Sequence, residues 1–461
     1  MKIATILSIL FLCSITSVFA QIPEEVSADY DLLMNVIVNQ YDAVGISAAV
    51  RVGDDMWTGT AGISAVGENL TTASTFGIGS TTKTFVSATI LQLMEEGELE
   101  LSDPISNYLP DYENIPGSLT IKQLLYHTSG LFNYTEHPDF VEVIFADLEH
   151  IYSPEEVLST FILEPIAEPE TEQTYSNTNY LLLGMIIKSI TGNEFYDEVA
   201  ERFDTATNYP SLSMPPFQTD ISEMAHLWLD TTLAGTQPQV DCIENGWALN
   251  SFFSAAHSAG AFAANPTDMA NWAYDLYSGN LLQEASMDSL FDTHPFLLFG
   301  VIPYGLGVFS AQFGCGTTGW GHNGNIIYTS SMYYLPEYDL SLSVLTNDGN
   351  QIANAGGVEN IANELACLYI EFVTNVEEEK TTEIEVYPNP SANLFNVSTP
   401  FDLTNAQIEI YNHQGARVQP EIDLQGSVGS LDFSGLSAGG YSIVIIKDQQ
   451  IYRKQLLKLP G

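Results

Sequence analysis

Basic residues are scarce in this chain. Of its 461 residues, 12 are Lys or Arg and 58 are Asp or Glu, which gives a formal net charge of −46 at pH 7. Five of the basic side chains lie between residues 21 and 379, namely Arg51, Lys83, Lys122, Lys188 and Arg202. Such a surface repels nucleic acids and anionic membranes, so we expect neither as a partner. The acidity is typical of a soluble exported protein, and substrate steering is limited because salt screens charges beyond ~8 Å.

Cysteine is also rare, and its spacing predicts no metal site. Of the four cysteines, Cys13 lies in an N-terminal leader, which leaves Cys242, Cys315 and Cys367. An odd number permits at most one internal disulfide, and the sequence does not say which two residues pair. No His-Glu-x-x-His motif or Cys/His cluster is present, which disfavours a metal enzyme. We expect no metal and no cofactor.

Long apolar runs are absent after residue 20. None reaches the ~18–20 residues that span a bilayer, so we expect no transmembrane segment. Residues 1–20 have the pattern of a signal peptide: Lys2 supplies a positive start, an apolar stretch follows, and Ala20 ends a small-residue cleavage site. The sequence therefore predicts export of the chain that begins at Gln21.

The apolar periodicity predicts one α/β unit over residues 21–375. Residues 43–63 have the pattern of a β-hairpin, and a helical pattern runs from Thr81 to Gly97. Residues 119–206 are predicted to be largely helical, 301–348 to return to strands, and 359–374 to form a final helix. Strands at both ends with helices between them indicate a sheet assembled from distant parts of the chain.

The C-terminal region differs in character. A polar linker is expected at residues 376–382. Residues 383–461 contain short strands and turns with almost no helical periodicity, which predicts a small all-β sandwich of a size common for independent domains.

Ser80 and Lys83 form the first candidate catalytic pair. Glycine flanks Ser80 and a strongly helical run follows it, so Ser80 should lie at a helix N-terminus, where free N–H groups favour negative charge. Lys83 is three residues later, on the same face and within reach. A buried lysine can lose its proton near neutral pH and accept the serine proton. The alternative is a helix-capping serine beside a surface lysine.

Several further segments support the catalytic interpretation, because together with Ser-x-x-Lys they resemble the serine β-lactamase and penicillin-binding-protein family. The resemblance is to the class C and D-alanyl-D-alanine-carboxypeptidase branch and covers roughly residues 25–370. It implies a β-lactamase/transpeptidase-like fold, with an antiparallel sheet flanked by helices and a helical subdomain. The matching segments are residues 99–104, 124–131, Tyr175-Ser176-Asn177, residues 304–307 and Gly321-His322-Asn323-Gly324.

The resemblance also implies a role for each catalytic residue. Ser80 would attack the substrate carbonyl and Lys83 would lower the cost of its deprotonation. Tyr175 would pass a proton to the leaving group and then activate water, helped by Lys83 and His322 if these stabilise phenolate character. Asn177 would hold Lys83 and hydrogen-bond the substrate amide.

Three residues in and just after the segment Gly321–Gly324 complete the implied site. His322 stands where β-lactamases usually carry lysine, and histidine holds a substrate carboxylate less permanently because its ordinary pKa is near neutral. Gly324 would let the substrate backbone lie along the strand. The N–H of Asn325 would join that of Ser80 as an oxyanion hole, with each donor worth ~3 kcal/mol.

The expected activity is hydrolysis of an amide or ester through an acyl-enzyme on Ser80. D-amino-acid peptides and small esters are the first substrates to consider, in the manner of a carboxypeptidase, an aminopeptidase or an esterase. A β-lactamase is an alternative, weakened by the missing lysine. A catalytically inactive, surface-displayed binding protein with the same fold is another.

The tail has its own resemblance. Segments 386–390, 408–412, 436–441 and 454–458 resemble the C-terminal sorting domain of type IX secretion cargo in Gram-negative bacteria. The resemblance implies that residues 383–461 bind the type IX machinery. It also implies passage through the periplasm and then secretion or cell-surface attachment.

Overall fold

The computed structural model divides into two compact units, Met1–Ile370 and Glu371–Gly461. The predicted signal peptide and the predicted linker lie outside the residues that the structure describes. The described residues are 22–41, 43–230, 238–349, 357–375, 384–404, 406–412, 417–447 and 450–459.

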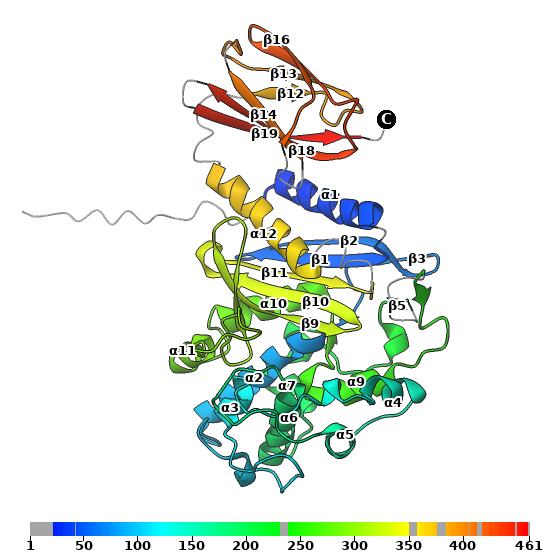
Figure 1. Cartoon of the computed structure of the whole chain (residues 1–461), viewed down its shortest axis with the longest axis vertical. Helices are drawn as coiled ribbons and strands as arrows, with labels where there is room; N and C mark the ends of the chain where they lie inside the picture. The colour runs from blue at the N-terminus through cyan, green and yellow to red at the C-terminus, as the bar shows by residue number, and fades with distance from the viewer. Residues whose placement is uncertain are drawn as a thin grey trace, which may run out of the picture. The chain divides into compact units, whose positions relative to one another are not determined.

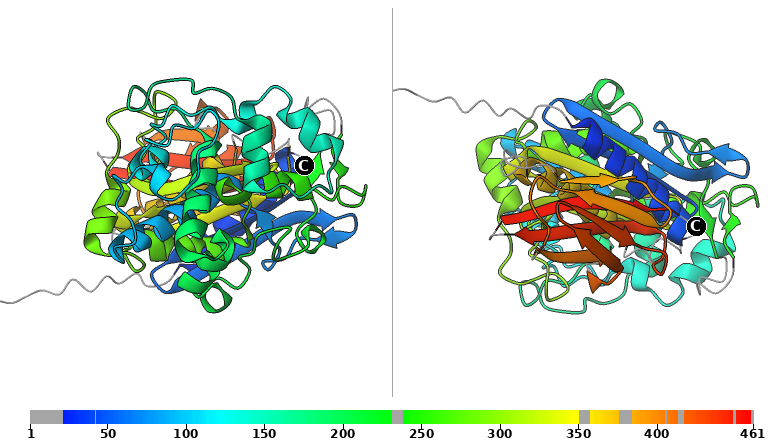
Figure 2. Two further views of the ribbon diagram at one scale, coloured as in Figure 1. Left: turned by 90° about the horizontal axis from the view of Figure 1, so that it is seen from below. Right: turned by 90° about the horizontal axis from the view of Figure 1, so that it is seen from above.

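A seven-stranded antiparallel sheet organises the first unit, with strand order β3-β2-β1-β11-β10-β9-β8. The predicted hairpin is confirmed, since β1 and β2 pair around the turn at Gly53. β1 also pairs with β11, from Ile46↔Thr346 to Val52↔Leu340, so the sheet joins distant parts of the chain as predicted. The blue and yellow strands lie side by side in Figures 1 and 2. The strands are β1 Gly45–Val52, β2 Asp55–Ala65, β3 Glu68–Asn69, β8 Phe309–Gln312, β9 Thr318–Ile326, β10 Tyr328–Leu335 and β11 Leu340–Thr346.

Helices cover both faces of this sheet. α1 (Glu24–Tyr41) and α12 (Gly357–Asn375) lie on one face, and α10 (Pro266–Tyr277) packs against β1, β10 and β11 on the other (Figure 1). α12 confirms the helix predicted at 359–374. Beyond α10 lies the helical part of the unit: α2 Thr82–Glu95, α3 Ile121–Leu125, α4 Phe140–Ala146, α5 Pro154–Phe161, α6 Asn177–Thr191, α7 Phe195–Arg202, α8 Thr205–Asn208, α9 Asn250–Ala256 and α11 Glu284–Phe291.

Two of these helices explain why the site-bearing segments are rigid. α2 is buried over most of its length, including Phe85 and Leu91, and α6 buries ten successive residues from Thr178 to Ile187. A helix that is apolar on all sides belongs in the interior of a domain. The two helices contact each other, so Lys83 on α2 and Asn177 at the start of α6 are carried by one packed core.

Beyond the end of α12 the second unit is all β, as predicted. Its sheets have the orders β12-β13-β17-β16 and β15-β14-β18-β19. Phe395, Ile443 and Ile445 are fully buried in its core. The strands are β12 Glu385–Tyr387, β13 Leu394–Ser398, β14 Gln407–Asn412, β15 Arg417–Val418, β16 Glu421–Gln425, β17 Val428–Asp432, β18 Gly439–Lys447 and β19 Gln450–Lys458.

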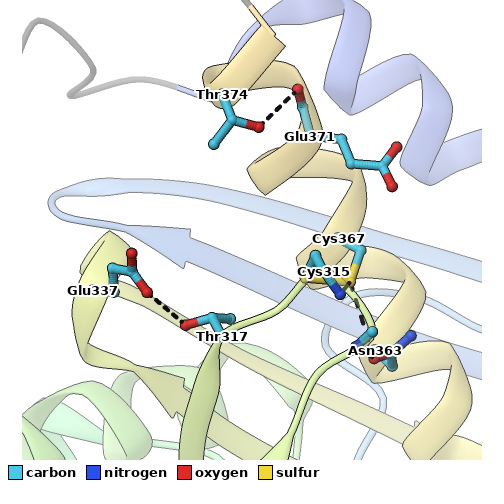
Figure 3. The surroundings of a disulfide bond; sticks show 8 residues. Cys315, Thr317, Glu337, Asn363, Cys367, Glu371 and Thr374 are labelled. Atoms are coloured by element: carbon cyan, nitrogen blue, oxygen red, sulfur yellow. Dashed lines mark hydrogen bonds between the residues drawn. A yellow bond between two sulfur atoms is a disulfide. The ribbon is translucent and has the colours of Figure 1, made fainter.

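A disulfide resolves the cysteine pairing that the sequence left open. Cys315, in the turn between β8 and β9, pairs with Cys367 on α12, with Cα atoms 5.3 Å apart (Figure 3). Cys242 is free and buried. The bond ties α12 to the sheet across a sequence separation of 52 residues.

We expect removal of this disulfide to destabilise the first unit by up to about 4 kcal/mol, because the closed loop restricts the unfolded chain. The measurement is chemical unfolding of the Cys315→Ala/Cys367→Ala protein beside the wild type, each with and without reductant. Reductant should lower the midpoint of the wild type alone. Equal midpoints in all four samples would contradict the prediction.

Candidate active site

Ser80 lies in a tight turn that leads into α2. The turn is the 3-10 helix η1 (Gly79–Thr81), so the serine precedes the α-helix by one short turn. Gly79 has φ +53°, and a Cβ there would lie 2.4 Å from the backbone nitrogen of Asn325. Only glycine permits both this conformation and this approach. Ser330 Oγ on β10 donates to the Ile78 carbonyl at 2.7 Å, so the sheet holds the turn in place.

Lys83 reaches Ser80 from the first turn of α2, as its spacing predicted. Its Nζ lies 3.0 Å from Ser80 Oγ, 2.8 Å from Asn177 Oδ1 and 2.6 Å from the carbonyl oxygen of Ala259. The side chain is fully buried. Burial lowers the pKa of Lys83 well below its usual range, because removal from water disfavours the charged form.

These contacts define how a neutral Lys83 can act. Asn177 Oδ1 and the Ala259 carbonyl are acceptors only, so they take the two N–H bonds of an uncharged amine. The nitrogen lone pair then faces the third neighbour, Ser80 Oγ, where it can accept the hydroxyl proton. The geometry therefore suits a general base, and the surface-lysine alternative is excluded by the burial of Lys83.

Tyr175 approaches Ser80 from the loop before α6. Its hydroxyl donates to Ser80 Oγ at 2.7 Å. The loop is fixed by His127, whose carbonyl accepts from Thr174 N at 2.9 Å and whose Nδ1 accepts from Ser176 N at 3.2 Å. The His127 ring packs beside the Tyr175 ring, with centroids 4.4 Å apart. His127 is thus a positioning residue for the phenol.

The protonation state of Tyr175 differs from the stabilised phenolate that was expected. Burial raises the pKa of Tyr175 above its ordinary value, and the hydrogen bond with Ser80 offsets only part of that rise. The resting residue is therefore a neutral phenol that can donate a proton.

Asn177, the first residue of α6, supports Lys83 as expected. Besides its contact with Lys83, its backbone N–H donates to Asn133 Oδ1 at 3.0 Å and its Nδ2 donates to Thr135 Oγ1 at 3.2 Å. These bonds orient the amide so that its oxygen faces the lysine. One Nδ2 hydrogen is left over from these bonds.

His322 is held by the protein rather than presented to a ligand. Its Nδ1 lies 2.6 Å from the Asn323 carbonyl, so Nδ1 carries the proton, and its Nε2 accepts from Tyr304 OH at 3.2 Å. The residue is 3% exposed. Burial, with a contribution from Lys83, lowers the pKa of His322 to about 3. At neutral pH His322 therefore carries no positive charge. It does not supply the charge that was expected to hold a substrate carboxylate or to stabilise a Tyr175 phenolate.

Gly324 and Asn325 lie on β9 beside the Ser80 turn. A Cβ on Gly324 would come within 1.8 Å of the Ile78 carbonyl oxygen. The glycine is therefore needed for the approach of the strand to the nucleophile turn, a structural reason that the sequence did not indicate. The Asn325 nitrogen lies close to Gly79, the residue before Ser80, and its part in an oxyanion hole stays a prediction.

Sequence reasoning missed three neighbours of this site. The Ala259 carbonyl cannot be identified from a sequence motif, because every residue has a backbone carbonyl. Tyr304 lay within a matched segment but had no assigned role. Phe299 stacks on Tyr175, with ring centroids 5.8 Å apart and planes inclined by 30°; its only signal was the apolar run at residues 296–301.

His257 begins the short turn (η5, His257–Ala259) that carries the Ala259 carbonyl. Burial, with a smaller contribution from Lys188, lowers the pKa of His257 to about 3. Because the unfolded chain binds this proton near pH 6.5 and the folded chain does not, stability should be full above pH 6.5 and fall as pH approaches 3. The loss from pH 7 to pH 5 is about 2 kcal/mol for this group.

Denaturant unfolding at both pH values tests this prediction. His257→Gln should unfold with a smaller difference between pH 7 and pH 5 than the wild type. His150→Gln, at a half-exposed histidine, is the control and should keep the wild-type difference. An unchanged difference in His257→Gln would refute the prediction.

The fold and this cluster define the class of the protein, which has a serine-hydrolase fold. The chain belongs to the beta-lactamase family, whose model matches residues 18–360. A second model, the secretion system C-terminal sorting domain, matches residues 385–458. The resemblance inferred from the motifs is thereby confirmed for both parts of the chain.

Two curated relatives are penicillin-binding proteins. Penicillin-binding protein 4* of Bacillus subtilis (strain 168) is 30% identical over 172 residues, 36% of this chain and 36% of that protein. Penicillin-binding protein 4 of Amycolatopsis lactamdurans is 26% identical over 207 residues, 41% of this chain and 51% of that protein. The chain thus spans about a third to a half of the length of these relatives.

Solved structures with the same fold include two amide hydrolases. A D-stereospecific amidohydrolase from Streptomyces sp. has a TM-score of 0.61 and 26% identity, covering 70% of this chain and 94% of that one. D-amino acid amidase from Ochrobactrum anthropi SV3, complexed with D-phenylalanine, has a TM-score of 0.64 and 21% identity, covering 76% and 99%. The predicted β-lactamase/transpeptidase-like fold is confirmed.

The sorting domain indicates type IX secretion to the cell surface or the extracellular space. Among the helices that the structure describes, none has the length and apolar character that a membrane crossing requires.

Proposed function

We propose that this protein hydrolyses an amide or ester through an acyl-enzyme on Ser80. One observation carries the proposal: Ser80 Oγ lies 3.0 Å from the buried Lys83 amine and accepts a hydrogen bond from Tyr175 at 2.7 Å. A base and an acid thus meet at one nucleophile, which is the arrangement that activated serines require.

Acylation starts with proton transfer from Ser80 Oγ to the lone pair of Lys83 Nζ. The oxygen attacks the carbonyl carbon, and the N–H groups of Ser80 and Asn325 bind the resulting oxyanion. The bond to the leaving group then breaks, and the leaving group takes the phenolic proton of Tyr175. Tyr175 recovers a proton from Lys83, whose amine is 5.0 Å from the phenol ring centroid. Lys83 is again neutral when the acyl-enzyme has formed.

Deacylation repeats these transfers with water. Tyr175 relays a proton from the attacking water to Lys83 as the hydroxyl group adds to the acyl carbon. The carbonyl re-forms, the bond to Ser80 Oγ breaks, and Lys83 returns the proton to Ser80. The same two groups thus serve both half-reactions, in opposite directions.

The charges near the site support uncharged substrates over carboxylates. His322 is neutral, and the basic side chains of the first unit outside the site have other partners: Arg51 with Asn271, Lys122 with the Tyr126 ring, Lys188 with Glu194 and Arg202 with Glu96. Carboxylates buried without a positive partner are costly. We therefore favour D-amino-acid amides, peptides processed from the amino end, and small esters. Carboxypeptidase substrates come after these, and β-lactams come last.

A substrate panel tests this proposal. Purified protein would be assayed with a D-amino-acid amide, a short p-nitrophenyl ester, a D-Ala-D-Ala peptide and nitrocefin, beside Ser80→Ala. We expect turnover of the first two, lost in the variant. Absence of turnover and of Ser80 labelling by a fluorophosphonate would instead support the inactive binding protein.

A further inference from the structure

An exposed apolar hairpin lies next to the catalytic tyrosine. Residues 296–301 are all apolar, and four of them are exposed: Phe296 by 40%, Leu297 by 43%, Phe299 by 69% and Val301 by 73%. Single exposed apolar residues are common, but a cluster of large ones marks a binding surface.

The hairpin is held rigidly. Leu298 N donates to the Ile302 carbonyl at 2.8 Å, and Ile302 N donates to the Leu298 carbonyl at 2.9 Å. At the base, His294 N donates to the Tyr304 carbonyl at 3.0 Å, and the His294 ring lies 3.2 Å from Glu170 Oε2. Leu298 is buried as an anchor. The exposed side chains are therefore presented on a fixed support.

Phe299 is held in an unfavourable backbone conformation. Its φ is +53°, in the left-handed region that residues with a side chain rarely adopt. This conformation accompanies the stacking of its ring on Tyr175. Strain of this kind is retained where the surroundings enforce it, and it is common at functional sites.

The position of Phe299 indicates which half of a substrate it meets. Tyr175 contacts Ser80 through its hydroxyl and, in the proposed mechanism, gives its proton to the leaving group. A ring stacked on Tyr175 therefore borders the leaving group rather than the acyl group. At the other end of the hairpin, Tyr304 bonds the neutral His322, so His322 brings no positive charge to that end.

We infer that the hairpin 294–304 forms the leaving-group subsite, in which Phe299 selects leaving groups that carry an apolar ring or a large aliphatic group and no carboxylate. This inference rests on the proposed function, because it assigns residues beside Ser80 and Tyr175 to the leaving group.

Two esters with the same acyl group provide the test. Benzyl and methyl esters release alcohols of closely similar acidity, so they differ in apolar size more than in chemistry. Burial of about half of a phenyl group corresponds to roughly tenfold in rate. We expect wild-type kcat/KM to favour the benzyl ester by about that factor, and Phe299→Ala to bring the benzyl-to-methyl ratio of kcat/KM close to one.

Two control variants distinguish a role of Phe299 in leaving-group selection from an unspecific loss of activity. Val66→Ala removes an equally exposed apolar side chain (74%) outside the hairpin and should retain the preference, as should Phe299→Trp. Hydrolysis of the common acyl-enzyme should be equally fast in all variants, because the leaving group has already gone.

Three results would overturn the inference. Phe299→Ala could slow both esters equally, change deacylation, or leave both esters unchanged while altering the oligomeric state, which would make the hairpin a contact between two copies. Failure of the proposed function looks different, since the wild type would then hydrolyse neither ester and Ser80 would carry no acyl group.

Discussion

Replacement of Lys83 by alanine lowers the rate of Ser80 acylation by about 10²- to 10⁴-fold, the range typical of a positioned general base. The reason is that the lone pair of Lys83 is the acceptor for the serine proton, 3.0 Å away. Lys83→Arg should be as slow, because a guanidinium stays protonated and cannot act as a base. The measurement is the pre-steady-state burst with an activated ester.

A matched control variant and the pH dependence of the acylation rate test this prediction further. Lys188→Ala removes a half-exposed lysine paired with Glu194 and should leave the burst unchanged. Because burial lowers the pKa of Lys83, the wild-type rate should rise with pH through a value well below 10.5 and then level off. A burst near the wild-type rate in folded Lys83→Ala would exclude the proton transfer.

Tyr175→Phe should slow acylation according to the leaving group. The variant lacks the proton that Tyr175 donates, so an alkyl amide, which needs that proton, should react about 10²- to 10⁴-fold more slowly. A p-nitrophenyl ester expels a stable anion and should be much less affected. The measurement is kcat/KM for both substrates, with the same acyl group.

Tyr338→Phe supplies the control, since it removes the same hydroxyl from the turn between β10 and β11. It should leave both rates at the wild-type value. An equal loss on both substrates in Tyr175→Phe would mean that the phenol orients Ser80 and does not act as an acid.

Much of the catalytic pair could be predicted from the sequence because its geometry is local. Lys83 follows Ser80 by three positions, and a helix brings residues at this spacing together wherever it lies. The β1–β2 hairpin was predictable for the same reason. Tyr175 and Asn177 were not accessible from spacing, and only the resemblance of Tyr175-Ser176-Asn177 to a family segment pointed to them.

Features that depend on close approach of distant segments could not be predicted. The resemblance implied substrate binding for Gly324, which stays a prediction, and gave no sign that the Ile78 carbonyl also requires a glycine there. It assigned His322 to a carboxylate, but both ring nitrogens bond to Tyr304 and Asn323. Burial and partner choice arise only when strands and helices from different parts of the chain meet.

The most direct test of the proposed activity is the mass of the protein after reaction with a slowly released acylating agent. We expect one acyl group per chain on the tryptic peptide 52–83, with fragments that place it on Ser80, and no adduct in Ser80→Ala. An acyl group on another residue, or turnover of substrate by Ser80→Ala at the wild-type rate, would contradict the assignment of Ser80 as the nucleophile.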